Sequence, residues 1–215
     1  MKRPARRILF GLIAGLVLLA VLACALPELQ QFITPQASLT PPAPLTENPP
    51  PAEIAGCPGN ILANGGFEAG ASGWDYTGSE HGQAIPSLPL ADSPEQVHSG
   101  KLAARLGGYE TASDRLSQSF VVPERGQLSL WWIYHSPDPI KDRDYMAGRI
   151  VLPNNEDGLP VFYAGGDAPQ DTWQQAQVDL SQYAGQRVTL EFGTSNDNYY
   201  ASWMVVDDIC VQSAP

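Results

Sequence analysis

Residues 187–192 have the sequence RVTLEF, and this short run carries the pattern that decides the fold. Val188, Leu190 and Phe192 alternate with polar residues, so a strand would place the three apolar side chains on one face. Residues 127–135, QLSLWWIYH, alternate in the same way but carry apolar or aromatic residues on both faces. We expect this second run to be a central strand that is covered on both sides.

Further strand-like runs recur towards the C-terminus, and turn-rich stretches separate them. No helical pattern of about 10–15 residues lies between them, which argues against a parallel α/β sheet. The sequence therefore predicts an all-β domain, a two-sheet antiparallel sandwich, over residues 57–215. The other strand runs are 118–122, 148–152 and 203–211, and the main turn stretches are 153–158 and 165–169.

Charge excludes one large class of partners. The chain has 215 residues, with 12 Lys and Arg against 23 Asp and Glu, for a net charge of −11. Four of the positive charges lie in the first seven residues, so the part after Ala23 carries 8 positive and 23 negative charges, or −15. Nucleic acid is therefore not an expected partner, because phosphate binding needs a basic patch.

Residues 1–26 have the composition of an export signal or a membrane anchor. A basic start, residues 1–7, precedes an unbroken apolar run of 19 residues, 8–26, which is just long enough to span a bilayer. Residues 21–24, VLAC, resemble a bacterial lipobox in which Cys24 would be lipidated, although Leu22 is larger than the usual residue. A lipoprotein and an uncleaved membrane anchor remain the two alternatives. Both place the rest of the chain outside the cytoplasm, tethered at the bacterial cell surface.

A Pro-rich linker is expected over residues 27–56. Nine prolines occur in the 32 residues from 27 to 58. Because proline removes the backbone donor and fixes φ, this stretch predicts an extended, disordered tether rather than a helix or a sheet.

Cys57 and Cys210 stand at the two ends of the predicted domain. In an exported protein two such cysteines are expected to pair, and the alternative is two free buried thiols. The bond would close nearly the whole domain into one loop. The chain-entropy model gives roughly 4–5 kcal/mol of stabilisation for a loop of this length.

Three segments together resemble the galactose-binding-like β-jelly-roll superfamily. They are 60–74 (NILANGGFEAGASGW), 97–107 (VHSGKLAARLG) and 172–211, which contains W…DLSQYAGQRVTLEF and closes on VDDI. The closest similarity is to carbohydrate-binding modules that open with N-G-x-F-E and to MAM-like modules of secreted peptidases. The resemblance implies a jelly-roll sandwich with a non-catalytic binding role, and it indicates the fold more strongly than the ligand.

The resemblance also implies a structural calcium ion. The matching positions are Glu68, the backbone carbonyls of Ser99 and Lys101, and Asp207 or Asp208. Calcium takes six to eight hard oxygen ligands, and two adjacent aspartates in an apolar strand are costly unless they are paired or coordinated. Strand alternation sends Asp207 and Asp208 to opposite faces, so we expect one of them to contribute, with Asp208 favoured. The alternative is two solvated carboxylates.

Carbohydrate is the expected ligand, because sugars stack on aromatic rings while amides and carboxylates bind their hydroxyl groups. The acidic charge is compatible with neutral glycans and disfavours acidic ones. For the tyrosines of the 194–200 loop the alternative is ordinary packing. The candidate residues are Asn196, Asn198, Tyr199 and Tyr200 in that loop, and Trp131, Tyr134 and Tyr163 as a platform on a concave face.

Enzymatic activity is not expected. The sequence contains no G-x-S-x-G elbow, no H-E-x-x-H, no P-loop and no Rossmann glycine pattern. An unrecognised hydrolase is the remaining enzymatic alternative. The other non-catalytic alternative is an adhesive or scaffold module of the cell envelope that contacts a surface protein. We expect the domain to be monomeric.

Overall fold

The computed structural model describes Ile54, residues 57–140 and residues 143–214. The chain divides into two compact units between Thr46 and Glu47, and every described residue belongs to the second unit. The predicted signal or anchor (1–26), its Cys24 and the predicted linker up to residue 53 lie outside the described residues. In the described part, no helix combines the length and the apolar character needed to cross a membrane.

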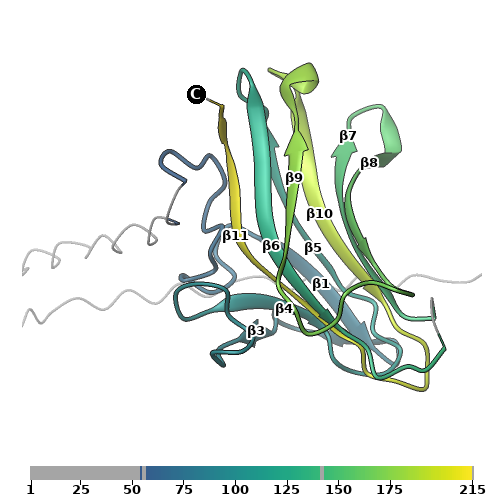
Figure 1. The fold of residues 1–215 in the computed structure, drawn as a ribbon. Coiled ribbons are helices and arrows are strands. Elements are labelled where there is room, and N and C mark those ends of the chain that lie inside the picture. The colour runs from purple at the N-terminus through teal and green to yellow at the C-terminus, as the bar shows by residue number, and fades with distance from the viewer. Residues whose placement is uncertain (1–53, 55–56, 141–142, 215) are drawn as a thin grey trace, which may run out of the picture. The chain divides into compact units, whose positions relative to one another are not determined.

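Two antiparallel sheets pack against each other in this part of the chain (Figure 1). The six-stranded sheet has the order β2-β1-β5-β10-β7-β8, and the five-stranded sheet has the order β3-β4-β11-β6-β9. The expected all-β, two-sheet antiparallel sandwich is confirmed. The elements are β1 (Asp75–Glu80), β2 (Gln83–Ile85), β3 (Leu90–Ala91), β4 (Ala103–Gly107), β5 (Arg115–Val121), β6 (Gly126–His135), β7 (Tyr145–Leu152), β8 (Asn155–Ala164), β9 (Gln174–Asp179), the 3-10 helix η1 (Ser181–Tyr183), β10 (Arg187–Ser195) and β11 (Trp203–Ser213).

All five strand runs expected from the sequence are present, as β5, β6, β7, β10 and β11. One predicted turn is mostly wrong: only Pro153 and Asn154 turn the chain, and β8 begins at Asn155. A two-residue turn is enough to join antiparallel strands, so polar residues that look like a long loop continue the ladder instead. The short strands β1 to β3 were not predicted, because they lack a long apolar alternation.

The core lies between the two sheets and uses the faces that the alternation predicts. Val188, Leu190 and Phe192 of β10 are all buried there. From the opposite sheet, Trp132 of β6 stacks on Phe162 of β8, with 4.7 Å between the ring centroids. Burial of these apolar side chains is the main favourable contribution to folding.

The outer face of the five-stranded sheet is covered as well. Ile133 of β6 is buried in a second, smaller cluster with Ala103 and Val205, and Val97 packs on this cluster from the β3–β4 loop. This confirms the expectation that β6 is covered on both sides.

The N-terminal turn of the domain packs tightly against the last strand. A Cβ atom on Gly65 would collide with the carbonyl oxygen of Ile209, so only glycine fits there. Two residues on, Phe67 adopts a φ of 57° and its fully buried ring lies 5.2 Å from that of Trp74. The glycines of the N-G-G-F motif therefore let the chain approach β11 closely before Phe67 enters the core.

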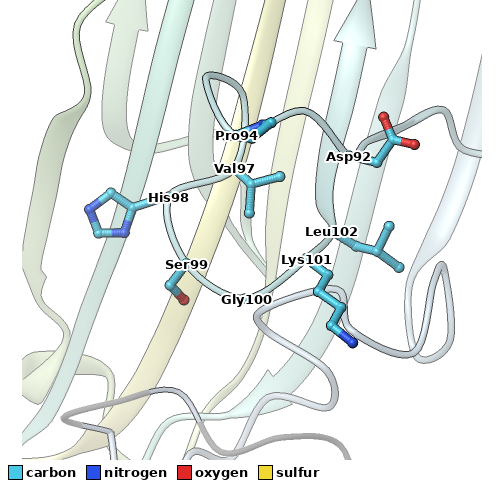
Figure 2. Close-up of a pocket in the computed structure, with 8 residues that line it drawn as sticks. All are labelled: Asp92, Pro94, Val97, His98, Ser99, Gly100, Lys101 and Leu102. Atoms are coloured by element: carbon cyan, nitrogen blue, oxygen red, sulfur yellow. The ribbon is translucent and has the colours of Figure 1, made fainter.

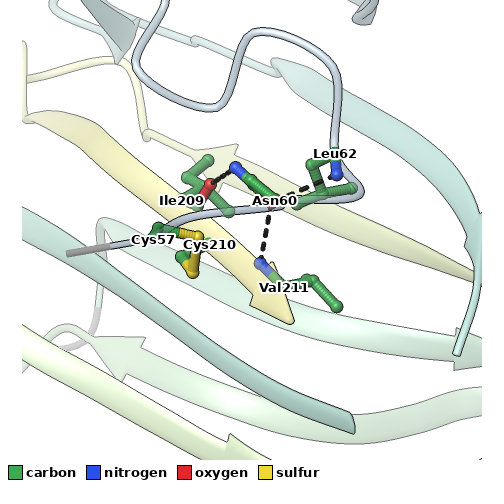
Figure 3. The surroundings of a disulfide bond; sticks show 6 residues. All are labelled: Cys57, Asn60, Leu62, Ile209, Cys210 and Val211. Carbon is green, nitrogen blue, oxygen red and sulfur yellow. Dashed lines mark hydrogen bonds between the residues drawn. A yellow bond between two sulfur atoms is a disulfide. The ribbon is translucent and has the colours of Figure 1, made fainter. Parts of the chain in front are cut away.

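A disulfide joins Cys57 to Cys210, as predicted, with 6.0 Å between the Cα atoms (Figure 3). Beside it, the Asn60 side chain donates to the carbonyl oxygen of Ile209 at 2.8 Å and accepts from the backbone nitrogen of Val211 at 2.9 Å. The start of the domain is thus tied to its last strand by one covalent bond and by hydrogen bonds.

Candidate functional site

Asp207 and Asp208 both turn towards the loop between β3 and β4, and the expectation that they point to opposite faces is wrong. The pairing of β11 is irregular between Asp207 and Cys210, and Asp208 has a φ of 49°, which breaks the alternation of a regular strand. Asp207 accepts the backbone N–H groups of His98 and Ser99, at 3.0 and 3.2 Å. Asp208 accepts the Ser99 hydroxyl at 2.7 Å and lies 2.6 Å from His98 Nδ1.

Glu68 binds the other end of the same loop, which Figure 2 shows curving from Val97 to Leu102. One oxygen of Glu68 accepts the backbone N–H groups of Lys101 and Leu102, at 2.7 and 3.0 Å. Immediately before Lys101, a Cβ atom on Gly100 would collide with this carboxylate, and the φ of 70° at Gly100 also favours glycine. Three carboxylates from two distant parts of the sequence, Glu68 and the adjacent pair Asp207 and Asp208, therefore converge on one loop, which we call the carboxylate loop (97–102).

Desolvation dominates the electrostatics at this loop. Asp207 is fully buried, and this burial, with the neighbouring charge of Asp208 as a second cause, raises the pKa of the Asp207 carboxyl to about 7. The five positions implied for calcium, Glu68, Ser99, Lys101, Asp207 and Asp208, are brought together here. Their carboxylates already accept hydrogen bonds from the protein, mostly from the loop backbone.

A different acidic cluster stands at one end of the sandwich. The cluster consists of Asp138, Asp144 and Asp197, whose carboxylate oxygens lie within 4.8 Å of one another. In the described part of the chain, no other three side chains of the metal-binding types His, Cys, Asp and Glu come this close together. Asp144 is buried and accepts the backbone N–H of Asp197 at 2.8 Å and the hydroxyl of Ser202. The cluster was not predicted, and its hydrogen bonds brace the loop between β10 and β11.

That loop carries four of the predicted sugar-binding residues, and they differ in exposure. Asn196 is buried, and its amide nitrogen donates to the carbonyl oxygens of Tyr109 and Ser202. Its side chain is therefore structural, which corrects the prediction that it contacts a ligand. Asn198 and Tyr199 are exposed and Tyr200 is half-buried; the guanidinium of Arg143 lies 5.5 Å from the Tyr199 ring centre.

The predicted platform of Trp131, Tyr134 and Tyr163 does not exist as one surface. Tyr134 is 2% exposed in the core, and its hydroxyl donates to the carbonyl oxygen of Asp144. Trp131 lies on the outer face of the five-stranded sheet, where His98 stacks on it with 4.2 Å between the ring centroids. Tyr163 belongs to β8, in the other sheet. The alternation of residues along a strand predicts which side chains share a face, but it does not predict which sheet the strand belongs to.

Tyr163 lies instead beside a tyrosine that the sequence analysis missed. On the outer face of the six-stranded sheet Tyr163 stacks with Tyr145. The ring centroids are 6.0 Å apart and the ring planes are inclined by 19°. Tyr163 is 56% exposed and Tyr145 is 42% exposed. Next to them is a hollow of about 240 Å³, which we call the tyrosine hollow. It is lined by Tyr145, Ala147, Arg149, Glu191, Gly193 and Thr194.

An ion cluster forms the polar side of the tyrosine hollow. Glu191 is 5% exposed, and one of its oxygens accepts Arg149 Nε and Nη2 at 2.9 and 2.6 Å. Its other oxygen forms an ion pair with Arg115 Nη2. One signal for this site was present in the sequence: the alternation of RVTLEF places Glu191 on the face away from the core.

Small residues create the space in the hollow. Ala147 and Gly193 lie on neighbouring strands between the tyrosines and the ion cluster. A Cβ on Gly193 would have a single neighbour within 4 Å, the carbonyl oxygen of Asp114 at 3.8 Å, so the space above Gly193 is open.

Comparisons with known proteins give fold neighbours only. No family model matches the sequence, and no curated protein matches it. Among solved structures, TmCBM61 in complex with β-1,4-galactotriose has a TM-score of 0.55 at 18% identity, covering 72% of this chain and 99% of that one. A family 16 carbohydrate-binding module has a TM-score of 0.46 at 15% identity, covering 72% of this chain and 100% of that one.

The neighbours also include the K1 adhesin domain of Lys-gingipain from Porphyromonas gingivalis W83, with a TM-score of 0.48, 12% identity and coverage of 67% of this chain and 92% of that one. At identities below 20% the similarity shows a shared fold. The chain therefore shares the β-sandwich fold of TmCBM61, and the expected two-sheet sandwich agrees with this similarity.

Proposed function

We propose that the chain is a non-catalytic carbohydrate-binding module and that the tyrosine hollow is its binding site. The observation that carries this proposal is the pair of exposed, stacked rings of Tyr145 and Tyr163 beside a hollow with a charged side. Aromatic rings bind the apolar faces of sugars, and polar groups beside them bind the hydroxyls. The rings and the hollow lie on strands of a packed sheet, so the site is formed before a ligand arrives.

The position of the disulfide supports a surface-tethered role. Cys57 and Cys210 share a hollow with Ser129, Trp131 and Gln175 on the outer face of the five-stranded sheet. The tyrosine hollow lies on the outer face of the other sheet. The point where the chain enters the described domain, Cys57, and the proposed binding site therefore lie on different sheets. A structural disulfide also fits an exported protein, because the cytoplasm is reducing.

The binding proposal is tested with the full chain, held in a detergent without a sugar headgroup and applied to a glycan array. We expect specific glycan binding that Tyr163→Ala and Tyr145→Ala each weaken at least tenfold, while Tyr199→Ala does not. Loss of binding on Tyr199→Ala alone would move the site to the β10–β11 loop. An array with no specific binding, from a chain shown to be folded, would favour the surface-protein partner instead.

We further propose that the carboxylate loop holds a structural calcium ion. Glu68, Asp207 and Asp208 would supply carboxylate oxygens, and Ser99 and Lys101 would supply backbone carbonyls. The support is the convergence of three carboxylates on one loop and the desolvation that raises the pKa of Asp207 to about 7. A cation beside two such carboxylates relieves their mutual repulsion. Its role would be to hold the loop against β11.

Thermal unfolding of the full chain tests the calcium proposal. Binding at 100 times the dissociation constant stabilises a folded protein by about 2.7 kcal/mol, so calcium should raise the unfolding midpoint by several degrees relative to EGTA. Glu68→Gln keeps an oxygen that can accept the loop N–H groups but removes the charge, and it should reduce the calcium effect. Equal midpoints of the unsubstituted chain in calcium and in EGTA would exclude the site.

We propose that the first 26 residues place the module at the bacterial cell surface, either through a lipid on Cys24 or as a membrane anchor. The two alternatives separate in one experiment, because a lipoprotein needs Cys24 and an anchor does not. Labelled fatty acid should be incorporated into the unsubstituted chain but not into Cys24→Ser if the residue is lipidated. Retention of Cys24→Ser in the membrane, together with no label in either chain, would establish the anchor.

A further inference from the structure

We propose that the tyrosine hollow selects glycans that carry a carboxylate, that is, uronate-containing chains. This inference rests on the proposed carbohydrate-binding function and names the ligand class of the same site. Two charged residues line the hollow, Arg149 and Glu191. Arg115 adjoins them, because it pairs with Glu191 and lies opposite Gly193 on the neighbouring strand (Figure 1 shows the strands β5, β10 and β7 side by side). In the ion pairs of Arg115 and Arg149 with Glu191, two guanidiniums share one carboxylate.

The carboxylate of Glu191 is already engaged by the protein. One oxygen accepts two N–H groups from Arg149, and the other is paired with Arg115. At 5% exposure, Glu191 presents little surface to a ligand. A neutral sugar is usually held by acceptors and donors together, because each hydroxyl group does both. Here the one carboxylate at the hollow is unavailable as an acceptor, so the charged side offers mainly donors.

The donors belong to a guanidinium that is fixed and yet open to solvent. Arg115 engages Glu191 through Nη2 while its side chain is 59% exposed. A guanidinium has five N–H donors in a planar fork that matches a carboxylate. The buried Glu191 thus orients the fork, which lowers the entropy lost when a second carboxylate binds. The ligand chemistry that fits a stacked tyrosine pair beside such a fork is a sugar ring with a carboxylate.

The net negative charge of the chain does not oppose this inference at short range. Screening at physiological ionic strength limits interactions between exposed charges to about 8 Å. On the described part of this face, the strand register places one more charged residue near Arg115, namely Asp75 of β1. Asp75 lies opposite Ser117, which is two residues from Arg115 along β5. It stands on the side of Arg115 away from Arg149, because β5 and β10 lie between β1 and β7. Among the described side chains of β1, β5, β7 and β10, the charged groups next to the hollow are therefore Arg115, Arg149 and Glu191.

A matched pair of ligands tests the proposal with the full chain. The probes are an oligogalacturonate and the same oligosaccharide after chemical reduction of its carboxyl groups to hydroxymethyl groups. We expect the uronate to bind about tenfold more tightly, because reduction of the carboxyl group removes the charged acceptor of the guanidinium N–H groups. The preference should decrease as salt is raised. Arg115→Gln should remove the preference, so that this variant binds the two probes with equal affinity.

Two control variants separate the possible failures. Arg187→Gln removes the same charge from the same face of the sheet. Arg187 is four residues from Glu191 along β10, or about 13 Å away, so this variant should still prefer the uronate probe. Tyr163→Ala should weaken the binding of both probes. Equal or tighter binding of the reduced probe would overturn the uronate proposal and leave the carbohydrate-binding function standing. An Arg115→Gln variant that still prefers the uronate over the reduced probe would also overturn the uronate proposal. Failure of every glycan to bind the folded chain would overturn both proposals.

Discussion

The two outer faces of the sandwich use aromatic residues in opposite ways. On the five-stranded sheet, Trp131 is stacked under His98, and Trp173 and Trp203 pack around a buried cluster beneath the carboxylate loop. On the six-stranded sheet, Tyr145 and Tyr163 stack on each other and remain exposed beside a hollow. One face is closed by a loop and a disulfide, and the other is left open.

This difference teaches that an aromatic residue on an outer strand face is not by itself a binding residue. A loop that crosses the sheet converts such a ring into part of a second core, as it does for Trp131. Substitutions on the covered face should therefore change stability, and substitutions on the open face should change ligand binding. The following predictions test this separation.

Loss of the disulfide should have the largest effect. The double variant Cys57→Ser and Cys210→Ser avoids a lone thiol and should lower the free energy of unfolding by roughly 4–5 kcal/mol, because the bond closes almost the whole domain. Guanidinium denaturation of both chains measures the difference. A change below about 1 kcal/mol would show that the hydrogen bonds of Asn60 hold the N-terminal segment without the covalent bond.

Two matched glycine substitutions should have the next largest effects on stability, and the two effects should differ. Gly65→Ala places a methyl group against the carbonyl oxygen of Ile209 and should destabilise the domain by about 1–3 kcal/mol. Gly193→Ala adds the same methyl group in open space on the binding face and should change stability by less than about 0.5 kcal/mol. Similar losses for both variants in thermal unfolding would contradict the difference in packing.

Trp131→Ala should destabilise the domain without affecting glycan binding. Its ring is half-buried and stacks on His98, so the loss should be about 2 kcal/mol, below the 3–5 kcal/mol of a fully buried ring. Unfolding curves give the stability, and titration with a bound glycan gives the affinity. A stable variant with weakened binding would place a ligand site on the covered face.

Tyr163→Ala should have the smallest effect on stability and the largest on binding. The residue is more than half exposed, so we expect a change in unfolding free energy of under about 0.5 kcal/mol. The affinity for glycan should fall at least tenfold, because one ring of the stack is lost. Unaltered affinity in a calorimetric titration would show that the tyrosine hollow is not the site.

Much of the fold could be predicted from strand periodicity alone. The faces of β6 and β10 were assigned correctly, since burial of one face of a pleated strand requires alternation. The first residues of β8, 155–158, were taken for part of a turn, because this polar start follows a two-residue reversal. The bulge at Asp208 was also missed, although it decides that both aspartates face the carboxylate loop.

The candidate site was predicted less well, because its residues come from different strands. Tyr163 was named, but as a partner of Trp131 and Tyr134, which lie on the other sheet and in the core. Tyr145, Arg115 and Arg149 carry no local signal that distinguishes them from ordinary surface residues. They become a site only where β5, β7, β8 and β10 stand side by side.

Local alternation predicts the sandwich class and the inward faces of the main strands, and the chemistry of an exported chain favours pairing of the two cysteines of the domain over two free thiols. Only the tertiary structure decided which aromatic rings are open. Exposure depends on which strands are neighbours and on which face a loop covers, and both are set by contacts between residues far apart in the sequence.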